Sequence, residues 1–377
     1  MKKLLKLKRF VLPNWAEKRY RERIILLDEA IKQHKLEVLV WEATRRCDLE
    51  CIHCGTPYEK EVSLNEMSTS QVKESFLKID KAFGIAELTA VSITGGEPTV
   101  RKDLIEIIKF ISNLGATQIV MHTNGNRIAK DKEYLNNLKT SGVTGIGINL
   151  DGLIDTHNWL RNDKKSYDLS VEAIKEIKNK KIKTMVSTVL TTRVVKELPR
   201  LREVIQTIKP DRWRLLPIEP IGRASVQLQN ELLKENDFLE IIEFLIESIT
   251  QYPELNIEMG CGQWYGKKLE GVIRPYIWYC IAGVNVLGIL SDGSVTACNN
   301  IDKSYIQGNI LVDDIQHIWN EKFIPFRQRE SFKIDYCNYC KDWELCKGGE
   351  MHLRNSKGDR ISPCLFFDLE KKEKNVF

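Results

Sequence analysis

The sequence predicts an α/β fold, in which a partial (β/α)6 TIM-like barrel precedes a small cysteine-rich C-terminal domain. Six short β-rich runs alternate with helix-like segments between residues 37 and 225, which is typical of a parallel sheet with crossover helices. Seven of the ten cysteines follow residue 260, where turn residues are frequent and long periodicity is rare. With 377 residues, of which 42% are hydrophobic, the chain can bury a large core.

The expected strands are rich in β-branched and apolar residues. They lie at residues 38–43, 88–94, 118–123, 145–150, 183–191 and 212–218. Right-handed β/α units can close into a barrel or remain an open sheet, and the pattern alone does not separate the two. Six units fit a partial barrel.

The expected helices follow from apolar residues at helical spacing. Residues 15–34 predict an amphipathic helix that packs against the barrel, or else acts as a lid or docking helix. Ser68 and Gln71 predict a capping box at the start of the next helix. A further helix should begin at Asp103 and stop near Gly115, and another should cover residues 231–251.

These elements divide the chain into four expected segments. They are a basic, amphipathic N-terminal helical segment (1–36), the barrel (37–225), a helical linker (226–260) and the cysteine-rich domain (261–377). The net charge of +5 is too small to indicate a nucleic-acid partner. Because neither a secretion signal nor a membrane span is visible, we expect a cytoplasmic protein whose cysteines serve metal or redox chemistry rather than disulfides.

Three of the cysteines form a C-x3-C-x2-C triplet directly after the first expected strand: Cys47, Cys51 and Cys54. Three thiolates can hold an iron-sulfur cluster and leave one iron open to a substrate or cofactor. A zinc loop and ordinary buried thiols are the alternatives. Zinc sites usually take their cysteines as C-x2-C pairs, with two further ligands some way along the chain, so the spacing favours the cluster.

The second expected strand ends in Gly95-Gly96-Glu97-Pro98, at the sheet edge where β/α folds carry their active sites. Together with the cysteine triplet one strand earlier, this turn resembles the signature of the radical S-adenosylmethionine (radical SAM) enzymes. In that signature an aromatic residue usually precedes the last cysteine of the triplet, and here His53 occupies that place. The resemblance implies a 4Fe-4S cluster on the triplet. It also implies that Gly95, Gly96 and Glu97 hold the amino group of SAM.

Further strand ends also match the radical SAM pattern. The resemblance implies that Asn149 and Arg161 contact the ribose and carboxylate of SAM, and an arginine fork suits a carboxylate. A turn or a surface ion pair is the alternative. Thr188 and Arg214 could point into the barrel mouth, and we expect His122 to be a packed strand residue rather than a catalytic base.

The C-terminal cysteines keep a second spacing pattern. Cys280 is followed by twelve residues, Gly293, four residues and Cys298, and then by Cys337-x2-Cys340-x5-Cys346 and Cys364. This order resembles the SPASM extension of radical SAM enzymes and implies an iron-sulfur domain with one or two auxiliary clusters. A zinc site on the second cysteine block is the competing interpretation.

One position departs from the SPASM pattern, because Glu350 stands where relatives have a further cysteine. The resemblance assigns one closed auxiliary cluster to Cys337, Cys340, Cys346 and Cys364. Cys280 and Cys298 belong to the other cluster, with Cys261 as a third ligand and Glu350, water or substrate as the fourth. Alternatively, Cys261 is a hydrogen-atom donor, as in radical SAM peptide epimerases, or a buried structural thiol.

The resemblance implies reductive cleavage of SAM to a 5′-deoxyadenosyl radical that removes a hydrogen atom from a substrate. Our leading expectation is a ribosomally made peptide or protein that receives a crosslink, thioether, oxidation or epimerisation. A small molecule or tetrapyrrole is the alternative, followed by a sulfatase-type maturase and a non-enzymatic metal-binding module. Asn299 disfavours the sulfatase type, whose members place an aspartate there.

The same resemblance implies partners for the enzyme. An electron donor such as flavodoxin or ferredoxin would reduce the cluster. The N-terminal segment is too short for the peptide-recognition domain of some relatives, so a separate leader-peptide-binding protein could be needed.

Overall fold

The structure is a computed structural model that describes residues 14–56, 59–61, 63, 65–274, 276, 278–364 and 366. The most basic part of the expected N-terminal segment, within the first ten residues, lies outside the described residues. Residues 14–33 of that segment form helix α2 (Asn14–Gln33), as the apolar spacing predicts. None of the described helices is long and apolar enough to cross a membrane.

Six consecutive parallel strands form the centre of the molecule. They are β1 (Val38–Glu42), β2 (Ala90–Thr94), β3 (Ile119–Thr123), β4 (Gly145–Asn149), β5 (Lys183–Leu190) and β6 (Arg212–Pro217). Each lies within the range that the sequence predicts for it, and they pair in chain order. The two ends of the sheet do not pair with each other, so the described strands form a curved open sheet, which confirms the partial barrel.

The sheet continues beyond the six expected strands. Strand β7 (Ile257–Met259) adds to β6 in parallel, and β8 (Val286–Ile289) adds to β1 in parallel. Strands β9 (Ser294–Thr296) and β10 (Gly308–Asn309) extend that side in antiparallel fashion. Residues after the expected linker therefore belong to the same ten-stranded sheet as the barrel.

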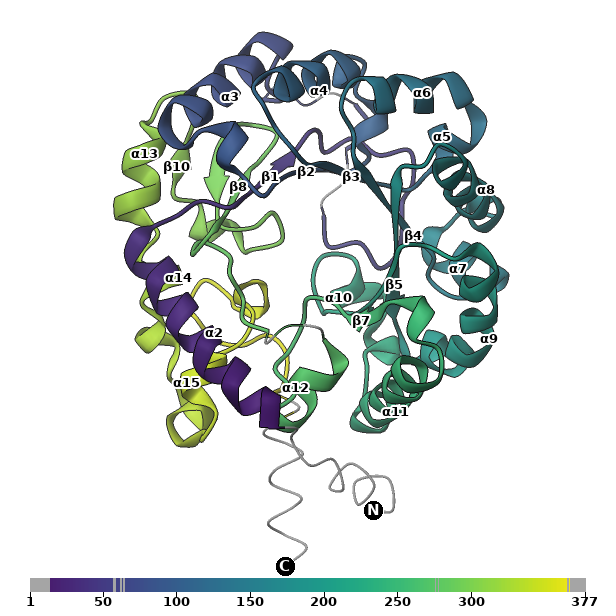
Figure 1. Cartoon of the computed structure of the whole chain (residues 1–377), viewed down its shortest axis with the longest axis vertical. Helices are drawn as coiled ribbons and strands as arrows, with labels where there is room; N and C mark the ends of the chain where they lie inside the picture. Colours follow the sequence, from purple (N-terminus) through teal and green to yellow (C-terminus); the bar gives the residue numbers. More distant parts are fainter. Residues whose placement is uncertain are drawn as a thin grey trace, which may run out of the picture.

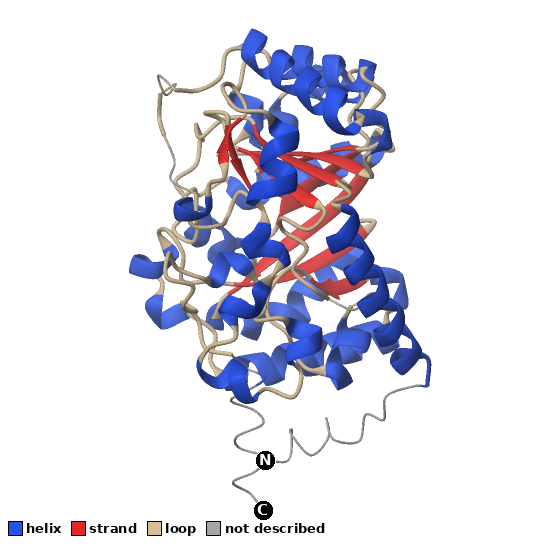
Figure 2. Ribbon diagram, turned by 90° about the vertical axis from the view of Figure 1, so that its left-hand side faces the viewer, coloured by secondary structure: helices blue, strands red, loops and turns tan. Residues whose placement is uncertain are grey.

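Most long helices lie along the outer side of the curved sheet, and the strands run between helices when the molecule is turned by 90° (Figures 1 and 2). The helices that follow β1 to β6 in the chain and precede β7 are α3 (Thr69–Phe83), α4 (Leu104–Asn113), α5 (Asn126–Lys130), α6 (Lys132–Thr140), α7 (Ile154–Arg161), α8 (Ser166–Asn179), α9 (Thr192–Ile208), α10 (Ala224–Gln227) and α11 (Glu235–Gln251), of which the short α10 lies inside the ring of helices (Figure 1). The later helices are short: α12 (Lys267–Ile273), α13 (Ile315–His317), α14 (Ile324–Arg327) and α15 (Trp343–Cys346). The expected capping box of Ser68 and Gln71 starts α3, and Asp103 precedes α4.

Side chains alternate between the two faces of each strand. The outer face is apolar and packs on the helices: Trp41 of β1 meets Phe76 of α3 edge to face with ring centroids 5.7 Å apart, and Trp213 of β6 meets Phe244 of α11 at 5.9 Å. The inner face carries polar side chains, among them Asn149 and Arg214. The carboxyl ends of the strands therefore border an interior suited to a polar ligand.

Candidate active site

The cysteine triplet lies on a loop that leaves β1 and is closed at its base. Arg46 and Glu59 form a parallel bridge, in which the Cys47 amide donates to the Glu59 carbonyl at 3.4 Å. The Glu59 amide in turn donates to the Arg45 carbonyl at 3.1 Å. These contacts fix where the loop begins and ends.

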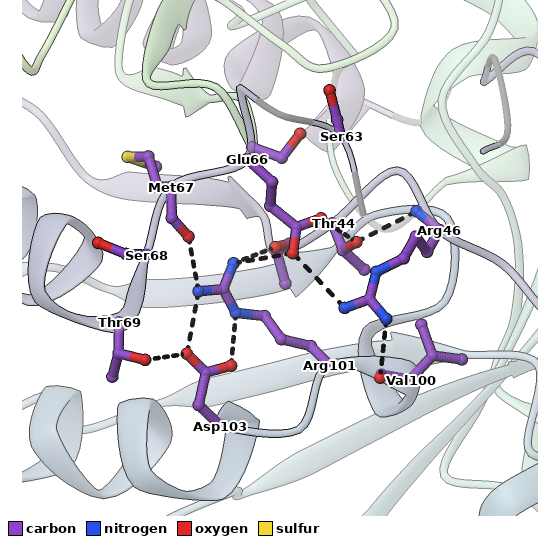
Figure 3. A network of polar contacts seen from close by, with 12 residues as sticks. Thr44, Arg46, Ser63, Glu66, Met67, Ser68, Thr69, Val100, Arg101 and Asp103 are labelled. Carbon is purple, nitrogen blue, oxygen red and sulfur yellow. Dashed lines mark hydrogen bonds and ion pairs between the residues drawn. The ribbon is translucent and has the colours of Figure 1, made fainter. Parts of the chain in front are cut away.

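The start of the loop is held by a buried polar network (Figure 3). The Arg101 guanidinium, only 4% exposed, donates to the carbonyls of Ala43 at 2.8 Å and Met67 at 2.9 Å. Glu66 joins this network, because Thr44 donates to it and Arg46 lies 3.5 Å from its carboxylate. No local pattern singles out Arg101, because its partners are backbone carbonyls far away along the chain.

The turn after β2 packs its backbone against the same segment. The Gly96 amide donates to the Thr44 carbonyl and the Glu97 amide to the Arg46 carbonyl, both at 2.7 Å. A Cβ atom on Gly96 would lie 2.3 Å from the Arg46 carbonyl oxygen, and one on Gly95 would lie 2.4 Å from that of Thr44. Both positions need glycine because two backbones meet there.

The Glu97 carboxylate joins the end of β2 to the end of β3. It is 1% exposed and accepts hydrogen bonds from the Thr99 amide at 3.0 Å and hydroxyl at 2.7 Å, from the Thr123 hydroxyl at 2.6 Å and from the Asn124 amide at 2.7 Å. Burial raises the pKa of Glu97, and these donors oppose that rise. Only one of the four bonds reaches Oε2, so this oxygen can accept a further donor.

The residues after β3 tether the triplet loop directly. Asp48, which follows Cys47, accepts from the side-chain amides of Asn124 at 2.6 Å and Asn126 at 2.9 Å. Burial raises the pKa of the Cys47 thiol to about 12, whereas the Leu49 amide, which donates to its sulfur at 3.4 Å, lowers it.

Cys51 lies beside a buried ion pair. Arg161, at the end of α7, donates to the Cys51 sulfur at 3.7 Å and pairs with Asp151 after β4. His53 lies 3.7 Å from the same carboxylate, and burial lowers its pKa to about 4. Burial raises the pKa of Cys51, and the guanidinium opposes this by favouring the thiolate. Arg161 is therefore a buried residue next to the triplet rather than part of a surface ion pair.

A contact from the end of β6 was not expected from the sequence. Arg223 donates to the Cys51 carbonyl at 2.7 Å through its side chain, and to the Cys54 carbonyl at 3.1 Å through its amide. Gly222 makes this approach possible, since its φ is +56° and a Cβ atom there would lie 2.6 Å from the Gly55 carbonyl oxygen. The triplet loop is thus contacted by residues from four strand ends.

The structure corrects the orientation expected for Thr188. Its hydroxyl donates to the Leu150 carbonyl at 2.7 Å and accepts from the Trp213 indole at 2.9 Å, on the outer face that packs on α11. Thr188 therefore does not point into the barrel mouth. By strand alternation the inner position belongs to Ser187, which is paired in register with Asn149 of β4 and Arg214 of β6.

Three of the later cysteines gather with two carboxylates. Cys261 interacts electrostatically with Cys280, Cys298, Glu219 and Glu350, and burial, followed by these groups, raises the pKa of its thiol. Cys261 is nevertheless exposed, so it is not a thiol of a packed core. Burial raises the pKa of Cys298 to about 11, and backbone amides of Asn300 and Asn299 donate to its sulfur. Glu219, after β6, was not identified from the sequence.

The remaining four cysteines surround one small cavity. Its lining includes all four of these residues together with aromatic and arginine side chains: Cys337, Cys340, Cys346, Cys364, Trp264, Tyr336, Trp343, Arg360 and Phe366. A single hollow bordered by four thiols and closed by aromatic rings matches the predicted ligand set of one closed cluster.

The donor chemistry of the three cysteine groups fits iron-sulfur clusters. Burial raises the pKa of at least one thiol in each group, and amide or guanidinium donors approach the sulfurs of Cys47, Cys51 and Cys298. Metal binding supplies the positive charge that deprotonates such thiols. Within the described part of the chain, no three His, Cys, Asp or Glu side chains are close enough together to hold a single metal ion.

Comparison with known proteins identifies the family of the chain. The chain matches the radical SAM superfamily over residues 41–205 and the SPASM iron-sulfur cluster-binding domain over residues 280–342. It is 26% identical to the Fe-coproporphyrin III synthase of Methanosarcina barkeri over 83% of each chain. It is 27% identical to the mycofactocin maturase MftC of Mycolicibacterium smegmatis over 83% of this chain and 77% of that protein.

Among solved structures, anSMEcpe with bound AdoMet and the Cp18Cys peptide has a similar fold. The TM-score is 0.67 and the identity 20%, over 90% of this chain and 95% of that one. The two matched domains carry the cysteine triplet and part of the later cysteine pattern in the predicted order. The chain is therefore a radical SAM enzyme with a SPASM domain, whose cofactors are SAM, a 4Fe-4S cluster and auxiliary iron-sulfur clusters.

Proposed function

We propose that this radical SAM enzyme abstracts a hydrogen atom from a ribosomally made peptide or protein and thereby modifies it. The modification would be a crosslink, a thioether, an oxidation or an epimerisation. When bound to Cys47, Cys51 and Cys54, a 4Fe-4S cluster reduced by an external donor would supply the one electron needed to cleave SAM to methionine and a 5′-deoxyadenosyl radical. The observation that carries the proposal is the tethering of the triplet loop at the carboxyl ends of the strands, beside the polar inner face.

The residues around the triplet have distinct proposed tasks. Cys47, Cys51 and Cys54 would hold the cluster, and Arg161 would favour the thiolate form of Cys51 that the cluster requires. The free acceptor site on Glu97 Oε2 would receive the amino group of SAM, with Gly95 and Gly96 shaping the turn. Asn149 and Ser187, adjacent on the inner face, would contact its sugar.

The C-terminal domain would shield this chemistry from water. His352 Nε2 lies 2.7 Å from Glu219 Oε1, which connects the end of β6 to the segment after the last cysteine block. Exclusion of water protects a reactive intermediate from side reactions.

The charges of the described interior favour a peptide over a tetrapyrrole. Arg214, which faces inward from β6, lies 3.5 Å from Glu258 of β7, and Arg161 is paired with Asp151. A coproporphyrin carries several carboxylates, and its recognition would require arginines that are not already neutralised by acids of the protein. A peptide needs no such excess of positive charge.

A tetrapyrrole is the second candidate substrate. It is favoured by the similarity to Fe-coproporphyrin III synthase, which extends over both domains. The identity to the maturase MftC is comparable, so sequence similarity does not separate the two substrate classes. We further propose a flavodoxin- or ferredoxin-type electron donor, and a separate leader-peptide-binding protein.

The substrate proposal is tested with the anaerobically reconstituted enzyme, SAM and a reductant. Short peptides encoded beside the gene and Fe-coproporphyrin III are offered in parallel, and mass spectrometry follows each compound. We expect a mass change in a peptide and none in the porphyrin. The Cys51→Ala variant is the control and should modify neither. A porphyrin product formed by the parent enzyme, with every peptide unchanged, would refute the peptide proposal.

A further inference from the structure

Two carboxylates, Glu219 and Glu350, interact electrostatically with Cys261, as do Cys280 and Cys298, and the two carboxylates differ in their partners. Glu219 Oε1 lies 2.7 Å from His352 Nε2, so that carboxylate has a charged or hydrogen-bonding partner within the protein. Glu350 is completely buried, and neither of its oxygens has a hydrogen-bond partner among the residues that the structure describes.

The nearest cation does not satisfy Glu350. Arg360 Nη2 lies 3.8 Å from Glu350 Oε1, which is too long for a hydrogen bond. The same guanidinium donates instead to the carbonyls of Gly348 at 3.0 Å and Ser362 at 3.2 Å. Burying a carboxylate without donors is costly, so native proteins pair such groups or use them to bind metals.

The backbone brings Glu350 from one cysteine group toward the other. Lys347, Gly348 and Gly349 have φ angles of 47°, 83° and 79°, three consecutive residues in the left-handed region. This tight turn follows Cys346 of the four-cysteine cavity, and Glu350 interacts electrostatically with both Cys346 and Cys261. Glu350 therefore lies within electrostatic range of both groups, at the sequence position where the SPASM pattern has a cysteine.

We propose that the Glu350 carboxylate is the fourth ligand of the first auxiliary cluster and closes it together with the thiolates of Cys261, Cys280 and Cys298. This assigns Cys261 to the cluster rather than to hydrogen-atom donation, and it leaves no iron of this cluster open to substrate. The proposal rests on the iron-sulfur assignment of the SPASM domain and is independent of the substrate. The competing account is a loose buried ion pair between Glu350 and Arg360.

The test uses the full chain with Cys47, Cys51 and Cys54 replaced by alanine, so that the remaining iron belongs to the auxiliary sites. After anaerobic reconstitution, iron and sulfide are counted and the clusters are followed by electron paramagnetic resonance, Mössbauer spectroscopy and redox titration. Glu350→Ala should create one cluster with a labile iron, which mild oxidation converts to a 3Fe-4S signal absent from the parent. Glu350→Cys should keep the full iron content and shift the potential of the same cluster.

Matched variants distinguish a ligand from a structural carboxylate. Glu219→Gln should leave the iron count and the oxidation behaviour as in the parent, and Arg360→Gln should produce no 3Fe-4S signal. Cys261→Ala should disturb the same cluster as Glu350→Ala. The proposal is overturned if Glu350→Ala and Glu350→Cys both keep the parent spectrum and potential, or if Arg360→Gln reproduces the labile iron. It is also overturned if Cys261→Ala retains both clusters unchanged.

None of these readouts requires SAM cleavage. A protein that fails to modify any peptide can therefore still confirm or refute the Glu350 ligand, and the two proposals fail separately.

Discussion

The buried ion pair between Arg161 and Asp151 should be strongly coupled in a double-mutant cycle. Asp151 is fully buried, and its carboxylate also accepts the Val189 amide at 2.8 Å. Arg161→Met would leave this carboxylate without its cation, and removal of one partner of a buried pair costs about 3–5 kcal/mol. Asp151→Asn would leave Arg161 buried without its counter-ion, at a similar cost.

The double variant should be less destabilised than the sum of the single variants, by about 2–3 kcal/mol, because neither charge remains to be compensated. Urea unfolding of the full chain at neutral pH measures each free energy of unfolding. The exposed Lys73–Glu106 pair between α3 and α4 is the control, and its coupling should stay below about 1 kcal/mol.

The pH dependence has a definite sign. Burial raises the pKa of Asp151, but Arg161, together with His53, His157 and the Val189 amide, lowers it by more, so that the net pKa lies below its ordinary value. The pair therefore contributes stability above the unfolded pKa of about 3.9, and this contribution is lost as the pH falls through the folded pKa. An additive double variant, with no coupling beyond experimental error, would refute the account of the triplet environment.

Three further predictions concern neighbouring positions. Gly96→Ala should lower the free energy of unfolding by about 3 kcal/mol or more and reduce the iron content after reconstitution, because its Cβ would lie 2.3 Å from a backbone oxygen. In the control variant Gly145→Ala the nearest atom to the new Cβ is 3.6 Å away, so the free energy of unfolding should change by less than about 1 kcal/mol. Burial raises the pKa of Asp103, but its hydrogen bonds with Arg101 and Thr69 produce a net lowering of that pKa. Asp103→Asn should therefore lower the melting temperature at pH 7, and between roughly pH 5 and 2 the variant should lose less stability than the parent. Thr188→Val should lower the free energy of unfolding by about 1–3 kcal/mol and leave the SAM affinity unchanged, whereas Ser187→Val should weaken SAM binding in calorimetric titration. The reverse pattern would contradict the assignment of the two residues to opposite faces of β5.

Local patterns were enough to predict the central strands and the cysteine groups. Each strand combines a β-rich run with turn residues at its ends, and the triplet spacing limits how three thiols can be arranged. The capping box at Ser68 is likewise a contact between residues three apart. Such features depend on neighbours in the chain, so the sequence expresses them directly.

Features that depend on distant contacts were not predicted. Strand β8 joins β1 across more than two hundred residues, and Arg101 and Arg223 act through backbone carbonyls of the triplet loop. Thr188 was assigned to the wrong face because a shift of one residue along a strand reverses the side chain. The buried state of Glu350 and the pairing of Glu219 with His352 also emerge only when separate segments meet.

The most direct test of the central claim is the formation of 5′-deoxyadenosine from SAM by the anaerobically reconstituted full chain in the presence of a reductant. We predict that the parent protein forms 5′-deoxyadenosine and methionine. The Cys51→Ala variant should form neither, whereas Glu219→Gln should keep its triplet cluster and continue to form both. A parent protein that carries an intact triplet cluster and SAM but yields no 5′-deoxyadenosine would contradict the account.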